Sequence, residues 1–214
     1  MEKREFSHII IAIIVLTIAA SFSSFLNKSY SIIPWVFIFS AIIILTSIYS
    51  KKMVANHLDA DVEHELWLWQ RYGIKNNQKL SKPLPMGVIL PLIITLFSTG
   101  KILFLGLLTY ETRALKRRVA KRHGFYSFTE MTDVHNALIG SAGIFSLLIL
   151  GIIIYFLPFQ ISETLAKLAI YYAFWNVLPI SKFDGTQIYF GSPILYSITA
   201  TITFILAAVA LITI

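Results

Sequence analysis

Hydrophobic residues gather in long runs that are separated by polar and mostly basic stretches. Two runs come early, at about residues 9–25 and 31–50, and three come later, at about 137–157, 165–180 and 193–214. A helix needs about 20 largely apolar residues to cross the hydrocarbon core of a bilayer. The pattern therefore predicts five membrane-spanning helices.

A sixth apolar run, residues 85–110, is interrupted by the polar sequence Ser98-Thr99-Gly100-Lys101. Each half has about a dozen residues, too few to cross a bilayer. The run either crosses once with a kink or enters the membrane and returns as a re-entrant hairpin. Because cytoplasmic loops carry an excess of Lys and Arg, we favour the hairpin, which leaves the basic loops at about 51–84 and 111–136 on one, cytoplasmic side.

Composition narrows the class of protein further. Hydrophobic residues make up 57% of the 214 residues, which excludes a soluble protein and predicts an integral membrane protein with the bilayer as its partner. The net charge of +7 is explained by cytoplasmic loops. The basic cluster from Arg113 to Arg122 is expected to meet anionic headgroups and not nucleic acid, since no aromatic platform accompanies it. With no cysteine in the chain, any metal would need His, Asp or Glu ligands.

The predicted fold is an all-α polytopic bundle with about five spans and the re-entrant hairpin. The first run follows Met-Glu-Lys-Arg-Glu-Phe, like a signal peptide, but has no clear small-residue cleavage site. We therefore expect residues 1–30 to form an N-terminal anchor span and residues 31–214 to form one membrane domain.

Candidate chemistry begins with the sequence Asn-Val-Leu-Pro-Ile-Ser-Lys-Phe-Asp-Gly at residues 176–185. Asp184 follows an apolar run, where a charge is costly without a partner. Asp-Gly after Pro179 is also a common turn signal. The spacing of Asn176, Pro179, Asp184 and Gly185 resembles the conserved motif of the site-2 protease family, intramembrane zinc metalloproteases in which this aspartate is a zinc ligand.

Other segments extend the resemblance over roughly residues 40–190. Residues 85–92 are similar to a proline- and glycine-punctuated membrane segment of the family, and residues 140–143 resemble part of its Ala-Gly-Pro-x-x-Asn segment, with Ile144 in place of the proline. Residues 54–59 look like the Val-Ala-x-x-Leu-Gly stretch that follows the zinc-binding helix turn. Counting back eight residues from Ala55 places the family's His-Glu-x-x-His motif on residues 47–51, which here read Ser-Ile-Tyr-Ser-Lys.

This replacement removes the chemistry of the motif. Two histidines at i and i+4 share a helical face and bind zinc, while the glutamate deprotonates the bound water. Ser47 and Lys51 do not supply two neutral nitrogen ligands, and Ile48 does not accept a proton. The resemblance thus implies a site-2 protease-like fold with no catalytic residues and no cofactor, a pseudoprotease that binds membrane-embedded segments or partner proteins through the former substrate groove.

A second interpretation concerns residues 58–72. Their helical wheel shows an apolar stripe, which predicts an interfacial amphipathic helix with Trp67 and Trp69 at the headgroups. On its polar flank, His57, Asp61 and His64 recur at i, i+4 and i+7 and would hold a metal with Asp184 or His135. The alternative function is therefore an active, metal-dependent intramembrane protease with noncanonical ligands. A small transporter or channel subunit is a weaker alternative, because no repeat symmetry supports it.

Overall fold

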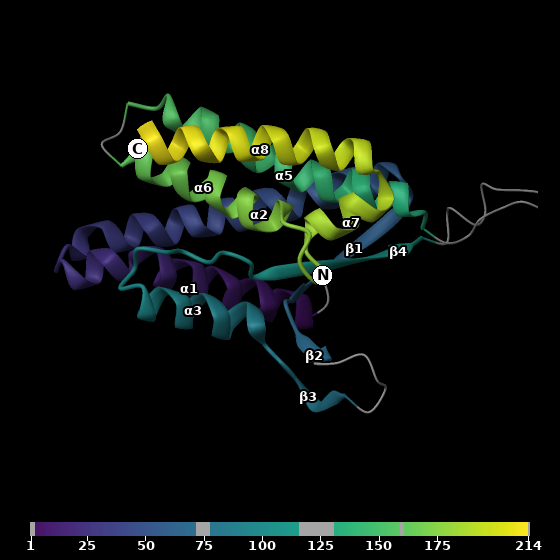
Figure 1. Ribbon diagram of the computed structural model, residues 1–214, viewed down its shortest axis with the longest axis horizontal. Helices are drawn as coiled ribbons and strands as arrows, with labels where there is room; N and C mark the ends of the chain where they lie inside the picture. Colours follow the sequence, from purple (N-terminus) through teal and green to yellow (C-terminus); the bar gives the residue numbers. More distant parts are fainter. Residues whose placement is uncertain (1–2, 72–77, 116–130, 159–160, 214) are drawn as a thin grey trace, which may run out of the picture. The chain divides into compact units, whose positions relative to one another are not determined.

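A computed structural model describes residues 3–71, 78–115, 131–158 and 161–213 (Figure 1). The basic residues Lys116, Arg117, Arg118, Lys121 and Arg122 of the predicted lipid-facing cluster lie outside these ranges. Helices dominate the described chain, which confirms the predicted helical character, and four short strands accompany them.

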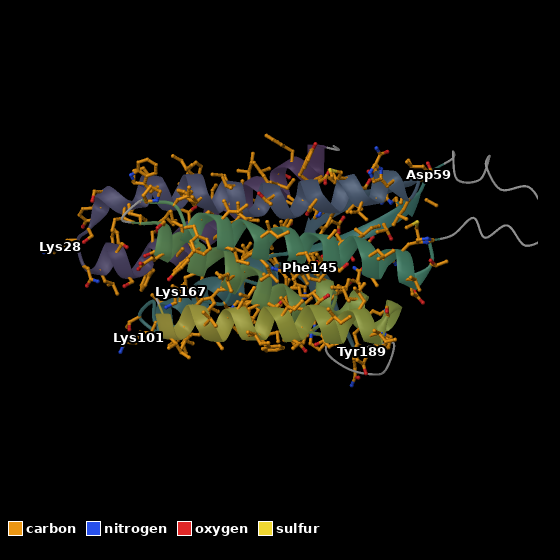
Figure 2. The ribbon with its side chains drawn as sticks, turned by 90° about the horizontal axis from the view of Figure 1, so that it is seen from above. Lys28, Asp59, Lys101, Phe145, Lys167 and Tyr189 are labelled. Atoms are coloured by element: carbon orange, nitrogen blue, oxygen red, sulfur yellow. The ribbon has the colours of Figure 1, made fainter. Side chains whose placement is uncertain are left out.

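Four of the helices are long and apolar enough to cross a membrane. They are α1 (Lys3–Leu26), α2 (Ile33–His57), α5 (Asp133–Tyr155) and α8 (Pro193–Thr213), and a 3₁₀ turn at Tyr30–Ile32 precedes α2. The fifth predicted span is the helix α6 (Ser162–Val177), whose 16 residues fall short of that length. Figure 2 shows carbon-rich side chains along the whole length of α8, as expected for a surface that faces hydrocarbon.

The chain reverses direction at the predicted break. Helix α3 (Met86–Phe97) ends at Ser98, and turns follow through Lys101. The return segment is irregular, not helical, and Leu105 and Leu107 on it are fully buried. The Leu107 carbonyl lies against Gly87 at the start of α3, where a Cβ would collide with it. The two ends of this hairpin therefore come together, and its depth in the bilayer stays a prediction.

The prediction of an amphipathic helix over residues 58–72 is wrong. Helix α2 continues to His57, and residues 60–66 form strand β1 (Ala60–Leu66). Strand β1 pairs with β4 (Leu108–Ala114), while β2 (Trp69–Arg71) pairs antiparallel with β3 (Lys79–Leu84). Burial alternates along β1, with its even-numbered residues inside, because successive side chains of a strand point to opposite faces.

The described chain divides into two compact units. The first contains residues 1–40 and 64–109, and in it α1 packs against α3. The second contains residues 41–63 and 110–214, and in it α5 packs against α6 and the short helix α7 (Asp184–Gly191), while α8 packs against α6. The candidate site below lies entirely in this second unit. The proposed division at residue 30 stays a prediction.

Candidate functional site: a buried lysine and aspartate

Lys51 and Asp184 form a buried ion pair within the second unit. The Lys51 Nζ atom lies 2.6 Å from Asp184 Oδ2, and the two side chains are only 6% and 1% exposed. Lys51 comes from the last two turns of α2, and Asp184 is the first residue of α7. A carboxylate is favoured at a helix N-terminus by the exposed backbone N–H groups there. Each charge thus has a partner in a region where an unpaired charge would be costly.

Two glycines in α5 make room for this pair. A Cβ at Gly143 would collide with the Lys51 Cε atom, and a Cβ at Gly140 would lie 2.7 Å from the Tyr110 hydroxyl oxygen. The Lys51 stem therefore lies directly on the bare backbone of α5. These two glycines begin and end the Gly-Ser-Ala-Gly sequence at residues 140–143.

Asp184 is held in place by the turn that precedes it. Asn176, near the end of α6, is buried and donates through Nδ2 to the Tyr172 carbonyl at 2.7 Å. Gly185 lies against the Val177 carbonyl so closely that a Cβ would collide with it. The glycine of the Asp-Gly pair is thus required by the contact between α7 and the end of α6. Pro179 lies in the connection and is exposed.

Tyr110 covers the ammonium of the pair. Lys51 Nζ lies 4.8 Å from the centre of the Tyr110 ring, within the range of a cation–π interaction. The Tyr110 hydroxyl donates to the Asn136 carbonyl at 2.8 Å. Burial and the neighbouring Asp184 carboxylate raise the pKa of this hydroxyl well above its ordinary value. Tyr110 is therefore a neutral wall of the site.

The Asp184 carboxyl depends on Lys51 for its main polar contact. Both of its oxygens are buried without a well-formed hydrogen bond among the described residues, and Oδ2 is the one that lies against the Lys51 ammonium. Burial raises the pKa of Asp184, and the Lys51 ammonium opposes that rise. The Lys51 ammonium is thus the counter-charge that compensates the buried Asp184 carboxylate.

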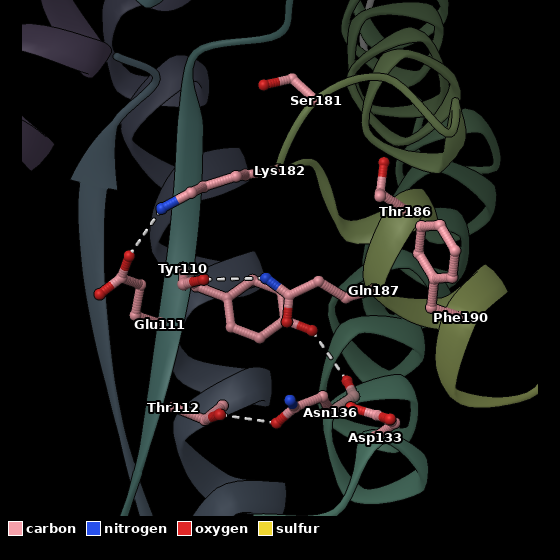
Figure 3. A pocket seen from close by; sticks show the side chains of 10 residues that line it. All are labelled: Tyr110, Glu111, Thr112, Asp133, Asn136, Ser181, Lys182, Thr186, Gln187 and Phe190. Carbon is pink, nitrogen blue, oxygen red and sulfur yellow. Dashed lines mark hydrogen bonds and ion pairs between the residues drawn. The ribbon is translucent and has the colours of Figure 1, made fainter. Parts of the chain in front are cut away.

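A pocket of about 440 Å³ with several polar side chains opens beside Tyr110 (Figure 3). Gln187 crosses it and donates through Nε2 to the Tyr110 carbonyl at 2.9 Å, while Thr112 donates to Asn136 Oδ1 at 2.6 Å. At its edge, Lys182 Nζ lies 2.9 Å from Glu111 Oε1. The other lining residues are Asp133, Ser181, Thr186 and Phe190. Most of the lining residues carry a polar group, so the pocket offers several hydrogen-bonding groups beside a larger share of apolar surface.

The alternative metal ligands are not brought together. His57 ends α2 and is exposed, and Asp61 is exposed on β1, where its Oδ1 accepts from the Val62 N–H at 2.9 Å. His64 points to the opposite face of β1, is buried, and lies in the first unit with its Nδ1 3.3 Å from Glu5 Oε1. The prediction that His57, Asp61 and His64 share one face required a helix. On a strand, residues three apart, such as Asp61 and His64, face opposite ways. Within the described ranges, no three His, Asp or Glu residues form a group suited to a metal.

The sequence did not predict the contact between Lys51 and Asp184 or the role of Tyr110. A signal for the pair was present, because each residue is a charge at the border of an apolar run. Tyr110 had no comparable signal, since it was one aromatic residue at the end of an interrupted apolar run.

Four apolar helices and a buried ion pair define this chain as a membrane-embedded helical protein. No family model, curated protein or solved structure shows a significant match to it.

Proposed function

We propose that this membrane protein is an inactive relative of the site-2 proteases in which an ion pair stands where the zinc ion would be, and that it binds membrane-embedded segments or partner proteins. The single observation that carries the proposal is the 2.6 Å contact between Lys51 and Asp184. The alignment counted back from Ala55 assigns positions 51 and 184 to two ligands of one zinc ion. Ligands of one zinc ion must lie close together in space, and the side chains of Lys51 and Asp184 do so.

The chemistry of the pair supports an inactive protein. Zinc binds deprotonated nitrogen, oxygen or sulfur donors, and a protonated ammonium has no free electron pair to offer. Lys51 instead brings its own positive charge to Asp184, so the carboxylate is compensated without a metal. Ile48, at the position of the family's glutamate, carries no group that accepts a proton from water. The noncanonical metalloprotease has no comparable support, because its candidate ligands are dispersed.

The pocket beside Tyr110 supports the binding role. Backbone N–H and C=O groups of an extended segment need partners wherever water is scarce. Glu111, Asn136 and Gln187 line the pocket with acceptors and donors of the required kinds, which an occupant would share with or take from their partners in the chain. Binding of this sort needs no metal, so it survives the loss of the zinc ligands.

Rebuilding the zinc site tests the proposed ancestry. The variant Ser47→His/Ile48→Glu/Lys51→His restores the family pattern on α2 and leaves Asp184 as third ligand. We expect metal analysis of the purified, folded variant to find about one zinc per chain. The same variant with Asp184→Asn is the matched control and should lose the zinc. A folded triple variant that binds no zinc would overturn the alignment.

Photocrosslinking tests the binding role separately. A benzoylphenylalanine at Phe190 lies on the pocket, and one at Phe156 is a control of similar exposure outside it. The reconstituted chain is mixed with a single-spanning peptide that contains a helix-breaking, extended stretch, or with an unbroken polyleucine span. Crosslinks from position 190 to the first peptide only are expected. Equal crosslinking from position 156, or none from 190, contradicts the binding role, and chelator-sensitive cleavage of the peptide contradicts the inactive state.

A further inference from the structure

Strands β2 and β3 of the first unit form a two-stranded ribbon whose surface carries positive charge and no negative charge. The sequence from 66 to 84 contains four basic residues, Arg71, Lys75, Lys79 and Lys82, and no Asp or Glu. Lys79 and Lys82 lie on the described part of β3 and are exposed. An electrostatic surface of one sign selects a partner of the opposite sign.

The base of the ribbon exposes apolar side chains next to these lysines. Trp69 and Leu84 are paired across the two strands and are each 42% exposed. Leu68, just before β2, is 39% exposed. Tryptophan is enriched at the membrane interface because its ring is apolar and its N–H is polar. A basic surface with an exposed tryptophan at its base fits a headgroup layer, where charge and apolar surface meet.

The ribbon is also joined directly to an apolar helix. Helix α3 begins two residues after Leu84, and its side chains at Ile93, Leu96 and Phe97 are exposed. Such a helix needs hydrocarbon around it, so the chain passes from the ribbon into an apolar environment over the length of α3. Figure 1 shows β2 and β3 beyond the N-terminal end of α3, within the same unit.

From this charge, this exposed tryptophan and this connection, we propose that the β2–β3 ribbon docks on a bilayer surface that contains anionic lipid headgroups. The pairing of β2 with β3 is irregular between Trp69 and Arg71, so strict alternation of faces does not hold along β3. Lys79 and Lys82 provide the attraction to the lipid phosphates, and Trp69 with Leu84 enters the interface. The role is independent of the proposed protease ancestry, because it uses no residue of the Lys51 site. It gives the first unit a lipid-dependent contact besides its apolar helices.

Site-directed spin labelling of the full chain tests this proposal. Since the chain has no cysteine, Ser81→Cys carries a nitroxide at a single position on β3. The protein is reconstituted in nanodiscs of phosphatidylcholine alone or mixed with phosphatidylglycerol. We expect the label to be less accessible to an aqueous nickel complex in the anionic discs, and high salt to reverse the difference.

Charge variants identify the groups responsible. Each lysine near an anionic surface contributes enough attraction to change the docked-to-free ratio about fivefold. Lys79→Gln/Lys82→Gln should therefore reduce that ratio about 25-fold, while Lys79→Arg/Lys82→Arg should keep it. The matched control is Lys28→Gln/Lys101→Gln, which removes two exposed lysines elsewhere in the first unit and should have little effect.

Three outcomes would overturn the proposal. The label would show equal accessibility in neutral and anionic discs, the control pair would have the same effect as the ribbon pair, or the arginine variant would fail to preserve docking. Circular dichroism and gel filtration of every variant distinguish these outcomes from misfolding. A label that remains accessible in both kinds of disc would favour a protein partner for the ribbon.

Discussion

Two lysine–carboxylate pairs among the described residues of the second unit differ mainly in their exposure to solvent. Lys51 and Asp184 are almost fully buried, whereas Lys182 and Glu111 are 66% and 51% exposed. Their distances are similar, at 2.6 Å and 2.9 Å between nitrogen and oxygen. When an exposed ion pair is broken, water replaces the lost partner of each charge. A buried charge that loses its partner has no water to replace it. Burial, more than distance, thus decides how much of the fold depends on each pair.

The largest effect is expected from removing one member of the buried pair. Asp184→Asn leaves the Lys51 ammonium buried without a counter-charge, which costs about 3–5 kcal/mol in comparable cases. Equilibrium unfolding in mixed micelles measures the change in the free energy of unfolding. The double variant Lys51→Met/Asp184→Leu removes both charges and should recover most of the loss. A single variant as stable as the parent would show that water reaches the pair.

Adding a methyl group at Gly143, where the Lys51 stem packs on α5, should have the next largest effect. Gly143→Ala places a Cβ against the lysine stem, and overpacking of this kind costs about 1–3 kcal/mol. Thermal unfolding reports the change. In the Lys51→Ala background, where the stem is absent, the same substitution should cost much less. An equal cost in both backgrounds would mean that Lys51 does not occupy that space.

Tyr110→Phe should have a smaller effect. The substitution keeps the ring over Lys51 but loses the hydrogen bond to the Asn136 carbonyl, a net loss of about 1 kcal/mol. Tyr110→Leu also removes the ring and should be worse by a further 0.5–2 kcal/mol or so. Comparison of the two variants by denaturant unfolding separates the hydroxyl from the ring. Equal stabilities of Tyr110→Phe and Tyr110→Leu would mean that the cation–π contact contributes no measurable stability.

The smallest effect is expected at the exposed pair. Lys182→Gln removes an ion pair that contributes at most about 1 kcal/mol. High salt should reduce even this difference, since exposed charges are screened. A loss as large as that of Asp184→Asn would mean that Lys182 supports the fold through another contact. Unfolding curves of both variants at low and high salt make the comparison.

The apolar pattern predicted the helices well because length and hydropathy act locally. Residues 9–25 were expected to span, and α1 covers Lys3–Leu26. The break at Ser98–Lys101 was also found, because a polar Ser-Thr-Gly-Lys sequence cannot continue an apolar helix. The pattern of apolar and polar residues did not predict that the return segment after Lys101 is irregular, because its conformation depends on packing within the first unit.

Strand β1 was mistaken for a helix because two periods fit the same residues. Val62 and Leu66 are four apart, which places them on one face of either a helix or a strand. Ala60 and His64 decide for the strand, since with them the buried residues recur at every second position, although His64 is polar. The metal hypothesis for His57, Asp61 and His64 depended on the helical period and lost its support with it.

For the candidate site, the sequence indicated Asp184 but not its partner. Asn176, Asp184 and Gly185 are buried where α6 meets α7, so the motif marks a structured turn. The partner required a contact between segments far apart in the chain, and local pattern carries no information on such contacts. The resemblance to the site-2 proteases paired positions 51 and 184 only as expected zinc ligands, and it did not predict an ion pair.

Tyr110 belongs both to the wall of the pocket and to the cover of the Lys51 ammonium. An occupant of the pocket that displaces this ring would change the free energy of the ion pair. Thermodynamic reciprocity then requires that the pair change the affinity for that occupant by the same factor. The stability of the ion pair would thus depend on whether the pocket is filled.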